Sequence, residues 1–364
     1  MPHTNSYFAA CDKQSPDERL DATDLVLLSA LGILAPAPNS DKEKNMALAA
    51  AIASGQRDIF AILSRYCLPQ DALSPRIVDA VAMSPDERIV LAVVKSMVAH
   101  PEFETHVIPS LLFTVCQLGY LSALKVILDR FHIDRQARLL HSAWGFDLAP
   151  GRLHAPLLAD DIDSGFLPLH FACKGDSEGN VAVIKYLLEE HRVDIDENQR
   201  IRPGSNDTQW TALHVAAYYG CLNAVRYLVE DSPIEPDIDA IDWATGKTPL
   251  LLATAERQPY VVFYLVQRGA DLTLTCDRSG SQVTALEYAL LEAEHDPEGL
   301  LAIVYLLHDL AGCRIRDASM FSASRLPKDF HLYLDVGAAP TATKSTPNED
   351  SSVDVESDRV TSSS

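Results

Sequence analysis

The sequence predicts an all-α solenoid, in which pairs of short helices stack on one another in a row. Residues 210–271 show the repeated unit twice, each time as a threonine, a run of leucine and alanine, and a second apolar run. Apolar residues recur three and four positions apart, which is the spacing of one face of a helix. Helices of this length cannot bury such a face alone, so each pair must pack against the next pair.

The repeated motif is most complete at Thr211-Ala-Leu-His-Val-Ala-Ala217, which is followed by Gly220. A threonine hydroxyl can cap the start of a helix, and a proline one position later, as at Pro249, has no hydrogen bond to lose. Gly220 can adopt the left-handed conformation that ends the first helix. This T-P-L-H-x-A-A motif, with the L-x-x-V-x-x-L-L run after it, resembles the ankyrin repeat. The resemblance implies an ankyrin-repeat solenoid of helix–turn–helix units with short hairpin loops, and a function in protein binding.

The template recurs along the chain at intervals near the ankyrin period of about 33 residues, except where longer loops intervene. The spacing alone predicts one unit: Pro75–Met83 and residues 86–97 fill a gap between two template matches that lie almost two periods apart. Four of the seven predicted repeats are clear and three are degenerate. Their starts are expected near Met46, Pro75, Ser110, Leu167, Thr211, Thr248 and Thr284.

The other segments are assigned by composition. An apolar helix at residues 25–31 is expected to cover the end of the stack, because terminal repeats must be capped; the alternative is a helix that binds a partner. The polar residues after Gly337 are expected to be disordered. The predicted boundaries are 1–44 for the N-terminal segment with its linker, 45–131 for degenerate repeats, 132–165 for an insertion, 166–313 for regular repeats, 314–336 for a C-terminal cap and 337–364 for the tail.

The composition indicates a folded chain, with 47% hydrophobic and 22% charged residues among 364. No apolar run approaches the roughly 18 residues of a membrane helix, so no membrane insertion is expected. Met1–Leu20 lacks a signal region, which favours an intracellular location in the cytoplasm or nucleus. Seven cysteines without a CxxC pair are typical of free, buried thiols in a reducing compartment.

The formal net charge of −21 argues against direct binding of nucleic acid, whose phosphates need clustered Lys and Arg. Little of this negative charge comes from the tail, so most of it lies on the folded part of the chain. It can serve to solvate the surface, or it can attract a basic partner. No cofactor is expected, because the sequence contains neither a phosphate-binding glycine loop nor an HExxH motif.

The resemblance also assigns roles within the motif. It implies that His170 and His214 tie adjacent hairpin loops together by hydrogen bonds, so neither is expected to be catalytic. Thr211, Thr248 and Thr284 are expected to start the first helices of their repeats. The polar residues of the motif are therefore interpreted as structural.

Ankyrin proteins bind partners through the hairpin tips and the exposed side of the first helix, and these positions are unusually aromatic here. Tryptophan and tyrosine are frequent anchors of interfaces. The alternative is that the rings pack across a neighbouring loop. The predicted partner-binding residues are Trp144, Trp210, Tyr218, Tyr219, Trp243 and Lys247.

The insertion at 132–165 is too rich in apolar residues for a solvated linker. It is expected to fold back on the neighbouring repeats, near the middle of the concave groove. Its metal-capable residues have no diagnostic spacing and are interpreted as a solvated turn, so no metal site is expected. They are His141, His154, Asp160, Asp161 and Asp163.

The leading interpretation is a non-enzymatic protein that binds another protein as an adaptor, an inhibitor or a subunit of a larger assembly. One alternative is an enzyme, or a protein of a biosynthetic pathway, that uses the solenoid as a scaffold, with a site between the insertion around Trp144 and the concave face. Another alternative is a transcriptional co-regulator, which the acidic tail allows.

Overall fold

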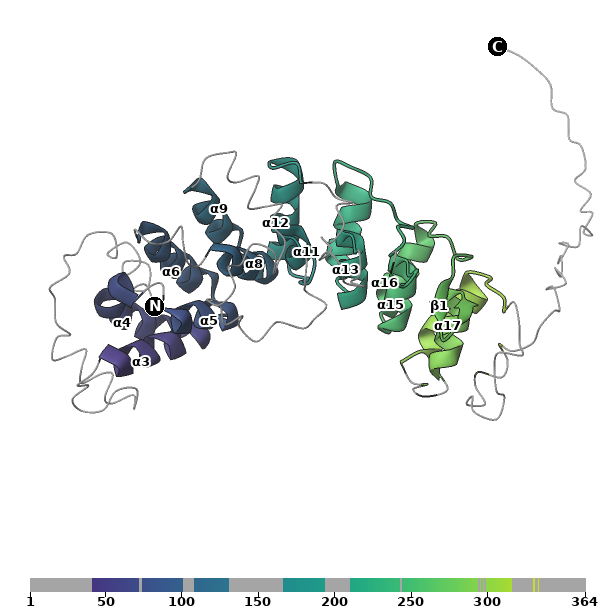
Figure 1. Cartoon of the computed structure of the whole chain (residues 1–364), viewed down its shortest axis with the longest axis horizontal. Helices are drawn as coiled ribbons and strands as arrows, with labels where there is room; N and C mark the ends of the chain where they lie inside the picture. The colour runs from purple at the N-terminus through teal and green to yellow at the C-terminus, as the bar shows by residue number, and fades with distance from the viewer. Residues whose placement is uncertain are drawn as a thin grey trace, which may run out of the picture.

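In the computed structural model of the chain, helices follow one another in pairs that form a single curved row (Figure 1). The structure describes residues 41–71, 74–100, 108–130, 166–193, 210–242, 244–293, 295, 297, 299–315, 330 and 333. The pairs within these residues are α3 (Asp41–Ala53) with α4 (Arg57–Asp71), α5 (Pro75–Met83) with α6 (Glu87–Ala99), α8 (Ile108–Leu118) with α9 (Leu121–Asp129), α11 (Pro168–Ala172) with α12 (Glu178–Glu189), α13 (Ala212–Tyr219) with α14 (Leu222–Arg226), α15 (Pro249–Ala255) with α16 (Pro259–Gln267), and α17 (Ala285–Ala293) with α18 (Leu301–Tyr305). The predicted all-α class is confirmed.

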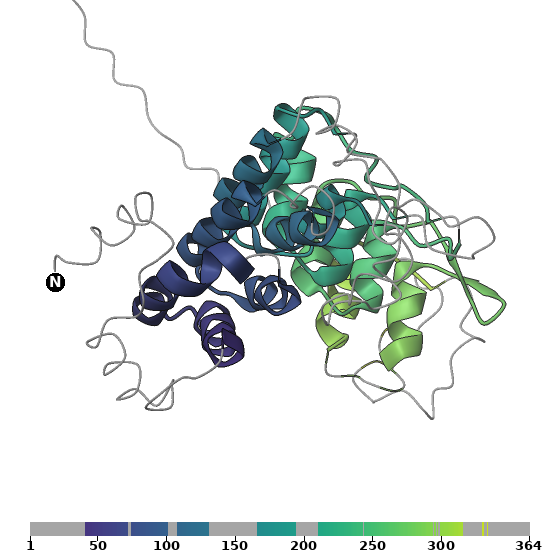
Figure 2. The same ribbon diagram turned by 60° about the vertical axis from the view of Figure 1, so that its left-hand side comes forward.

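The pairs build two layers. The first helices form a continuous inner row, in which α3, α5, α8, α11, α13, α15 and α17 each contact the next. The second helices form an outer row in the same way, from α4 through α6, α9, α12, α14 and α16 to α18. In Figure 1 the inner row lies on the hollow side of an arch, and Figure 2 shows the same stack from another side. Two second helices continue into π-helical turns, η2 (Tyr227–Asp231) after α14 and η3 (Leu306–Leu310) after α18.

The residues at the helix ends explain where the helices begin and stop. The Thr211 side chain accepts a hydrogen bond from the backbone N–H of His214 at the start of α13, as an N-cap residue does. Gly220 ends the same helix with φ of 72°, in the left-handed region that favours glycine. Asp86 caps α6 by accepting from the backbone N–H of Arg88 at 3.0 Å.

Asn180 joins two repeats through its side chain. Its Nδ2 donates to the carbonyl of Gln117 at 2.8 Å, to that of Cys116 at 3.3 Å and to that of Ala172 at 3.2 Å. Gly119 makes this approach possible, because a Cβ atom on it would lie 2.5 Å from the backbone nitrogen of Asn180. The turn of one repeat is therefore held against the second helix of the next.

The boundaries of some elements differ from those expected. Helix α3 begins at Asp41 rather than near Met46, because the helix continues through polar residues before the motif, and α8 begins at Ile108 rather than near Ser110. A short hairpin of β1 (Cys276–Arg278) and β2 (Ser281–Val283) also lies before α17. Its two turn residues have positive φ angles of 53° and 84°, as tight antiparallel hairpins require.

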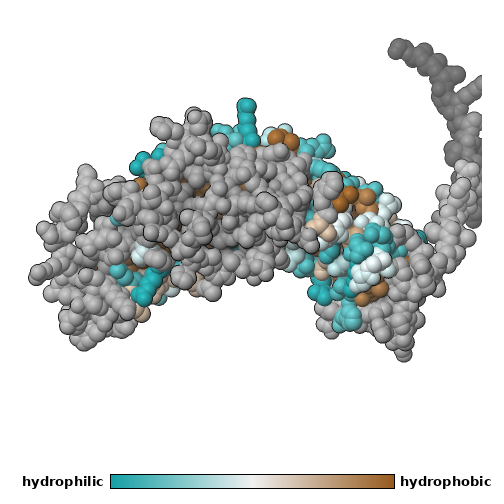
Figure 3. Space-filling view, viewed as in Figure 1, coloured by the Kyte–Doolittle hydropathy of each residue, from teal (hydrophilic) through white to brown (hydrophobic). Residues whose placement is uncertain are grey.

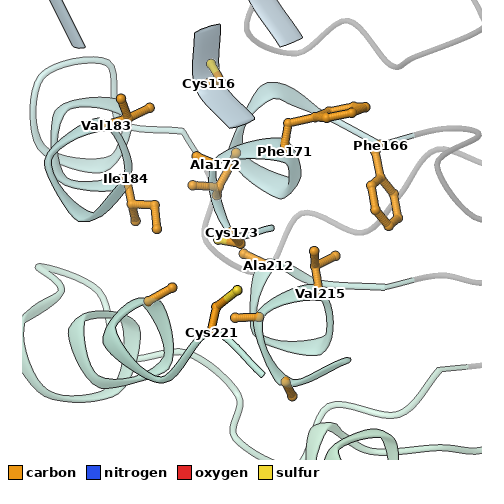
Figure 4. Close-up of a cluster of buried hydrophobic side chains, with 14 of the residues drawn as sticks. Cys116, Phe166, Phe171, Ala172, Cys173, Val183, Ile184, Ala212, Val215 and Cys221 are labelled. Carbon is orange, nitrogen blue, oxygen red and sulfur yellow. The ribbon is translucent and has the colours of Figure 1, made fainter. Parts of the chain in front are cut away.

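The core is one continuous apolar layer between the two rows, and free thiols form part of it (Figure 4). Cys116, Cys173 and Cys221 are buried, at 0%, 0% and 3% exposure. Burial raises the pKa of each thiol, and that of Cys221 reaches about 12. The three thiols are therefore protonated at neutral pH and act as small apolar side chains.

Several predicted segments lie outside the described residues: the capping helix at 25–31, the insertion at 132–165 and the tail at 337–364. Of the predicted C-terminal cap, Phe330 is 1% exposed and the ring of Tyr333 lies 4.9 Å from that of His308. Tyr333 thus packs against η3, and Phe330 belongs to the buried core. No described helix has the combination of length and apolar character needed to cross a membrane.

Candidate protein-interaction surface

His214 connects two hairpin loops. Its Nδ1 accepts a hydrogen bond from the backbone N–H of Thr211 at 3.1 Å, so the ring hydrogen lies on Nε2. Nε2 is 3.2 Å from the carbonyl oxygen of Lys247 in the next repeat, to which it donates. Burial lowers the pKa of His214 from 6.5 to about 4. The imidazole is therefore neutral and held between loops, which leaves it no access to a substrate.

His170 and Glu287 accept a hydrogen bond from the corresponding backbone N–H in two other repeats. His170 accepts from the backbone N–H of Leu167 through Nδ1 at 2.9 Å. In the last pair Glu287 takes this place, accepting from the backbone N–H of Thr284 at 2.9 Å while its own N–H donates to the Thr284 hydroxyl. Thr248 caps α15 by accepting from the Leu251 backbone at 3.3 Å. The motif residues thus position the hairpins on the inner side of the arch.

Trp210 does not stand at an exposed tip, so its expected placement as a surface anchor is corrected. The side chain is 4% exposed and packs between the rings of Phe166 and Tyr218, with centroids 6.2 and 4.9 Å away. Trp210 lies one position before the motif, as Phe166 does in the preceding repeat, and the two rings pack together in the core. Among the described residues the buried indole N–H has no hydrogen-bond partner. The predicted alternative, a ring packed against its neighbours, describes Trp210.

Tyr218 and Tyr219 lie at the end of α13 and are half-buried. Their rings meet edge to face at 5.0 Å. Lys174, from the preceding repeat, places its Nζ 4.8 Å from the Tyr219 ring centroid and 5.5 Å from that of Phe171. We call Lys174, Tyr218 and Tyr219 the first aromatic–cation group. It combines flat apolar area with a charge that the rings hold in place.

A second aromatic–cation group consists of Lys247, Arg278 and Tyr288. The Nζ of Lys247 and the guanidinium of Arg278 lie 5.1 and 4.8 Å from the centroid of the Tyr288 ring. Arg278 also pairs with Glu292 at 2.6 Å. Tyr288 belongs to α17, which contacts α15, and α15 contacts α13. Both groups therefore include tyrosines of the same row of first helices.

Sequence reasoning missed part of these groups. Tyr288 and Phe171 occupy the variable position directly after the motif's His position, where Tyr288 is half-buried and Phe171 is 3% exposed. Lys174 and Arg278 carry no sequence signal, because loops of different length bring them to the rings. Of the predicted binding residues, Lys247 lies in the second group, whereas Trp144 and Trp243 lie outside the described residues.

The part of the chain that the structure describes contains no group of three or more His, Cys, Asp or Glu side chains that could hold a metal ion. Glu256, beside the second aromatic–cation group, has its pKa raised by burial, while Lys247 and Arg257 oppose the shift.

A family model described as ankyrin repeats in three copies matches residues 91–242 and 169–276, more than half of the chain. The chain is 30% identical over 118 residues to the probable 26S proteasome regulatory subunit p28 of Saccharomyces cerevisiae, a match that covers 32% of this chain and 47% of that protein. It is 26% identical over 153 residues to palmitoyltransferase AKR1 of Lachancea kluyveri, covering 41% of this chain and 18% of that protein. The chain thus spans less than half of either relative.

Proposed function

The chain belongs to the ankyrin-repeat family, and on that premise we propose that it binds another protein through the inner side of its four C-terminal helix pairs. The observation that supports this assignment is the presence of the two aromatic–cation groups along one row of helices. Tyrosine and arginine are among the residues that contribute most to interfaces. A cation already held on a ring loses less conformational freedom when it meets a partner.

The net charge of −21 indicates the kind of partner. A strongly acidic surface speeds the approach of a basic protein and slows that of an acidic one. At contact, the rings supply apolar area, and Lys247 and Arg278 pair with carboxylates or carbonyls of the partner. The partner is therefore a protein with a basic surface that presents an apolar and hydrogen-bonding segment to the groove.

The role that fits best is an adaptor or a subunit of an assembly, in the cytoplasm or nucleus. The similarity to a probable regulatory subunit supports it. The other relative is an enzyme by name, but the match reaches only 18% of its length, so no transferase activity is carried over. The buried cysteine thiols, with raised pKa values, do not offer a nucleophile either.

Affinity capture with mass spectrometry, followed by measurement of Kd with the purified partner, tests the proposal. The double variant Tyr218→Ala/Tyr219→Ala removes apolar contact area and is expected to weaken binding by about tenfold or more. Lys247→Glu is expected to weaken it too, whereas Lys95→Glu, the same change on an exposed residue of the outer row, leaves it unchanged. Far-UV circular dichroism checks the fold of each variant.

Loss of binding in the Lys95→Glu control with retention in both inner variants would place the interface on the outer row and overturn the proposal. Purification of the chain without a stoichiometric partner, together with turnover of a substrate, would favour the enzyme alternative instead.

A further inference from the structure

Arg257 has a backbone conformation that is unfavourable for its side chain. Its φ is 56°, in the left-handed region, at the turn between α15 and α16. Three other helix pairs place glycine at this turn, where Gly55, Gly119 and Gly220 have φ of 67°, 74° and 72°. Besides glycine, the residues that enter this region most readily are Asn and Asp. The backbone therefore does not explain why the residue is an arginine.

The stacking of the repeats does not require the arginine either. At the preceding turn a side chain of the next repeat packs over glycine, since a Cβ atom on Gly220 would lie 2.2 Å from Oε1 of Gln258. At Arg257 the roles are reversed, since a Cβ atom on Gly299 would lie 2.8 Å from Cδ of Arg257. Neighbouring turns thus touch in both arrangements, and only the first avoids the unfavourable φ. Residues held in such conformations are frequent at binding sites.

Arg257 is exposed and lies between the two aromatic–cation groups. The next residue, Gln258, contacts Gly220 at the end of α13, the helix whose tyrosines belong to the first group. Burial raises the pKa of Glu256, and Lys247 and Arg257 both oppose this shift, so both cations lie near its carboxylate. Because Lys247 belongs to the second group, Arg257 is next to both of them.

The charges around Arg257 differ from those of the chain as a whole. Glu256 lies near Arg257, Lys247 and Glu292, and Glu292 is paired with Arg278 at 2.6 Å. These five residues comprise three cations and two acids, in a chain with a net charge of −21. In Figure 3, hydrophilic and apolar residues lie side by side on the C-terminal part of the arch. A carboxylate of a partner would meet a complementary charge at this point.

We propose that Arg257 binds a carboxylate in the partner segment that lies along the two aromatic–cation groups, and so selects partners with an acidic residue there. This inference rests on the proposed function, because it concerns the same surface. A guanidinium forms two parallel hydrogen bonds with a carboxylate, whereas an ammonium such as that of Lys247 acts as a point charge. Arginine is therefore the cation suited to recognise one acidic side chain.

The spacing of the repeats predicts where the acidic residue stands in the segment. Packed helices lie about 8–10 Å apart, and an extended chain advances about 3.3 Å per residue. One repeat therefore corresponds to about three residues of an extended segment. The carboxylate that meets Arg257 is expected at about this separation from the side chain that meets Tyr218 and Tyr219.

A display library of random linear peptides, selected on the immobilised full chain, tests the proposal. The wild type is expected to enrich peptides with Asp or Glu about three residues from an aromatic or apolar residue. Arg257→Gly is expected to lose the preference for the acid and to bind a wild-type peptide about tenfold more weakly. Arg257→Glu is expected to enrich Lys or Arg instead. Lys95→Glu, at an exposed residue of the outer row, is the control and is expected to enrich the same peptides as the wild type.

Thermal unfolding separates this role from a structural one. Arg257→Gly relieves the unfavourable φ, so its melting temperature is expected to equal or exceed that of the wild type. A lower melting temperature with an unchanged preference for the acid would show that Arg257 serves only the contact with Gly299, and would overturn the proposal. If Arg257→Gly does not fold, the exchange of preferred charge in Arg257→Glu decides.

The tyrosines of the first group distinguish this inference from the proposed function. Peptides whose binding is lost in Tyr218→Ala/Tyr219→Ala but does not depend on Arg257 would overturn the inference and leave the proposed function standing. Peptides that depend on neither, or no enrichment at all, would overturn both.

Discussion

Acidification provides a direct test of how His214 is packed. The ring accepts a hydrogen bond from Thr211 and donates one to the Lys247 carbonyl, both within the hairpin layer. Burial lowers its pKa from 6.5 to about 4. Between these two values the folded protein keeps the ring neutral, while the unfolded chain binds a proton there. Unfolding therefore takes up a proton, and the free energy of unfolding must fall as the pH falls through this window.

The size of the effect follows from the two pKa values. Each pKa unit is worth about 1.4 kcal/mol, so the full separation corresponds to about 3 kcal/mol. The contribution of neutral His214 to the free energy of unfolding is fully present above pH 6.5. It declines as the pH falls below that value, and the decline ends near pH 4. At pH 5 the unfolded side chain is mostly protonated and the folded one mostly neutral, which gives a loss of about 2 kcal/mol relative to pH 8.

Urea unfolding of the wild type and of His214→Gln at pH 8 and pH 5 measures this loss. The glutamine amide can accept from Thr211 but does not titrate. Other groups also respond to pH: burial raises the pKa of Glu256 and of Asp239, which stabilises the fold in acid. The informative quantity is therefore the difference between the two proteins. The variant is expected to lose about 2 kcal/mol less than the wild type between these pH values; equal losses would refute the reasoning.

Three further predictions concern stability. Leu228→Ala, at a residue with 0% exposure, is expected to lower the free energy of unfolding by about 2–5 kcal/mol in urea titration, and an unchanged midpoint would contradict the proposed packing. Asn180→Ala leaves carbonyls of two repeats without a donor and is expected to cost about 1–3 kcal/mol in the same assay. Gly119→Ala is expected to lower the melting temperature more than Gly269→Ala. Both glycines have positive φ, but of the two only Gly119 has other atoms within 4 Å of an added Cβ. Equal shifts of the melting temperature would show that backbone strain, and not the steric clash, sets the cost.

The repeat architecture could be predicted because it depends on local and periodic signals. Pro75–Met83 was located from spacing alone, and the structure has a helix with those bounds. The hairpin before α17 could not be predicted in the same way, since Ser279 gives no strong indication of its positive φ. The start of α3 at Asp41 was missed because polar residues continue a helix without showing an apolar face.

The binding surface was harder to predict, and Trp210 shows the reason. Residue type made it a candidate anchor, but a large ring also suits the core, and the sequence does not say which environment it meets. The structure puts it at 4% exposure beside Phe166, a residue 44 positions away by the numbering of the chain. Tyr288 is half-buried, whereas Phe171 and Val215, at the same motif position in other repeats, are buried. Contacts between repeats, which the sequence does not specify, decide between these two outcomes.

The outer row could be recognised only after the helices had been aligned by their buried residues. Arg226, Phe263 and Tyr305 stand at unequal intervals in the sequence, because the loops between repeats differ in length. Once the helices are aligned, the exposed position after two buried residues holds a cation in five pairs and an aromatic ring at Phe263 and Tyr305. The pattern therefore belongs to the stacked helices, and the loops between them hide it in the sequence.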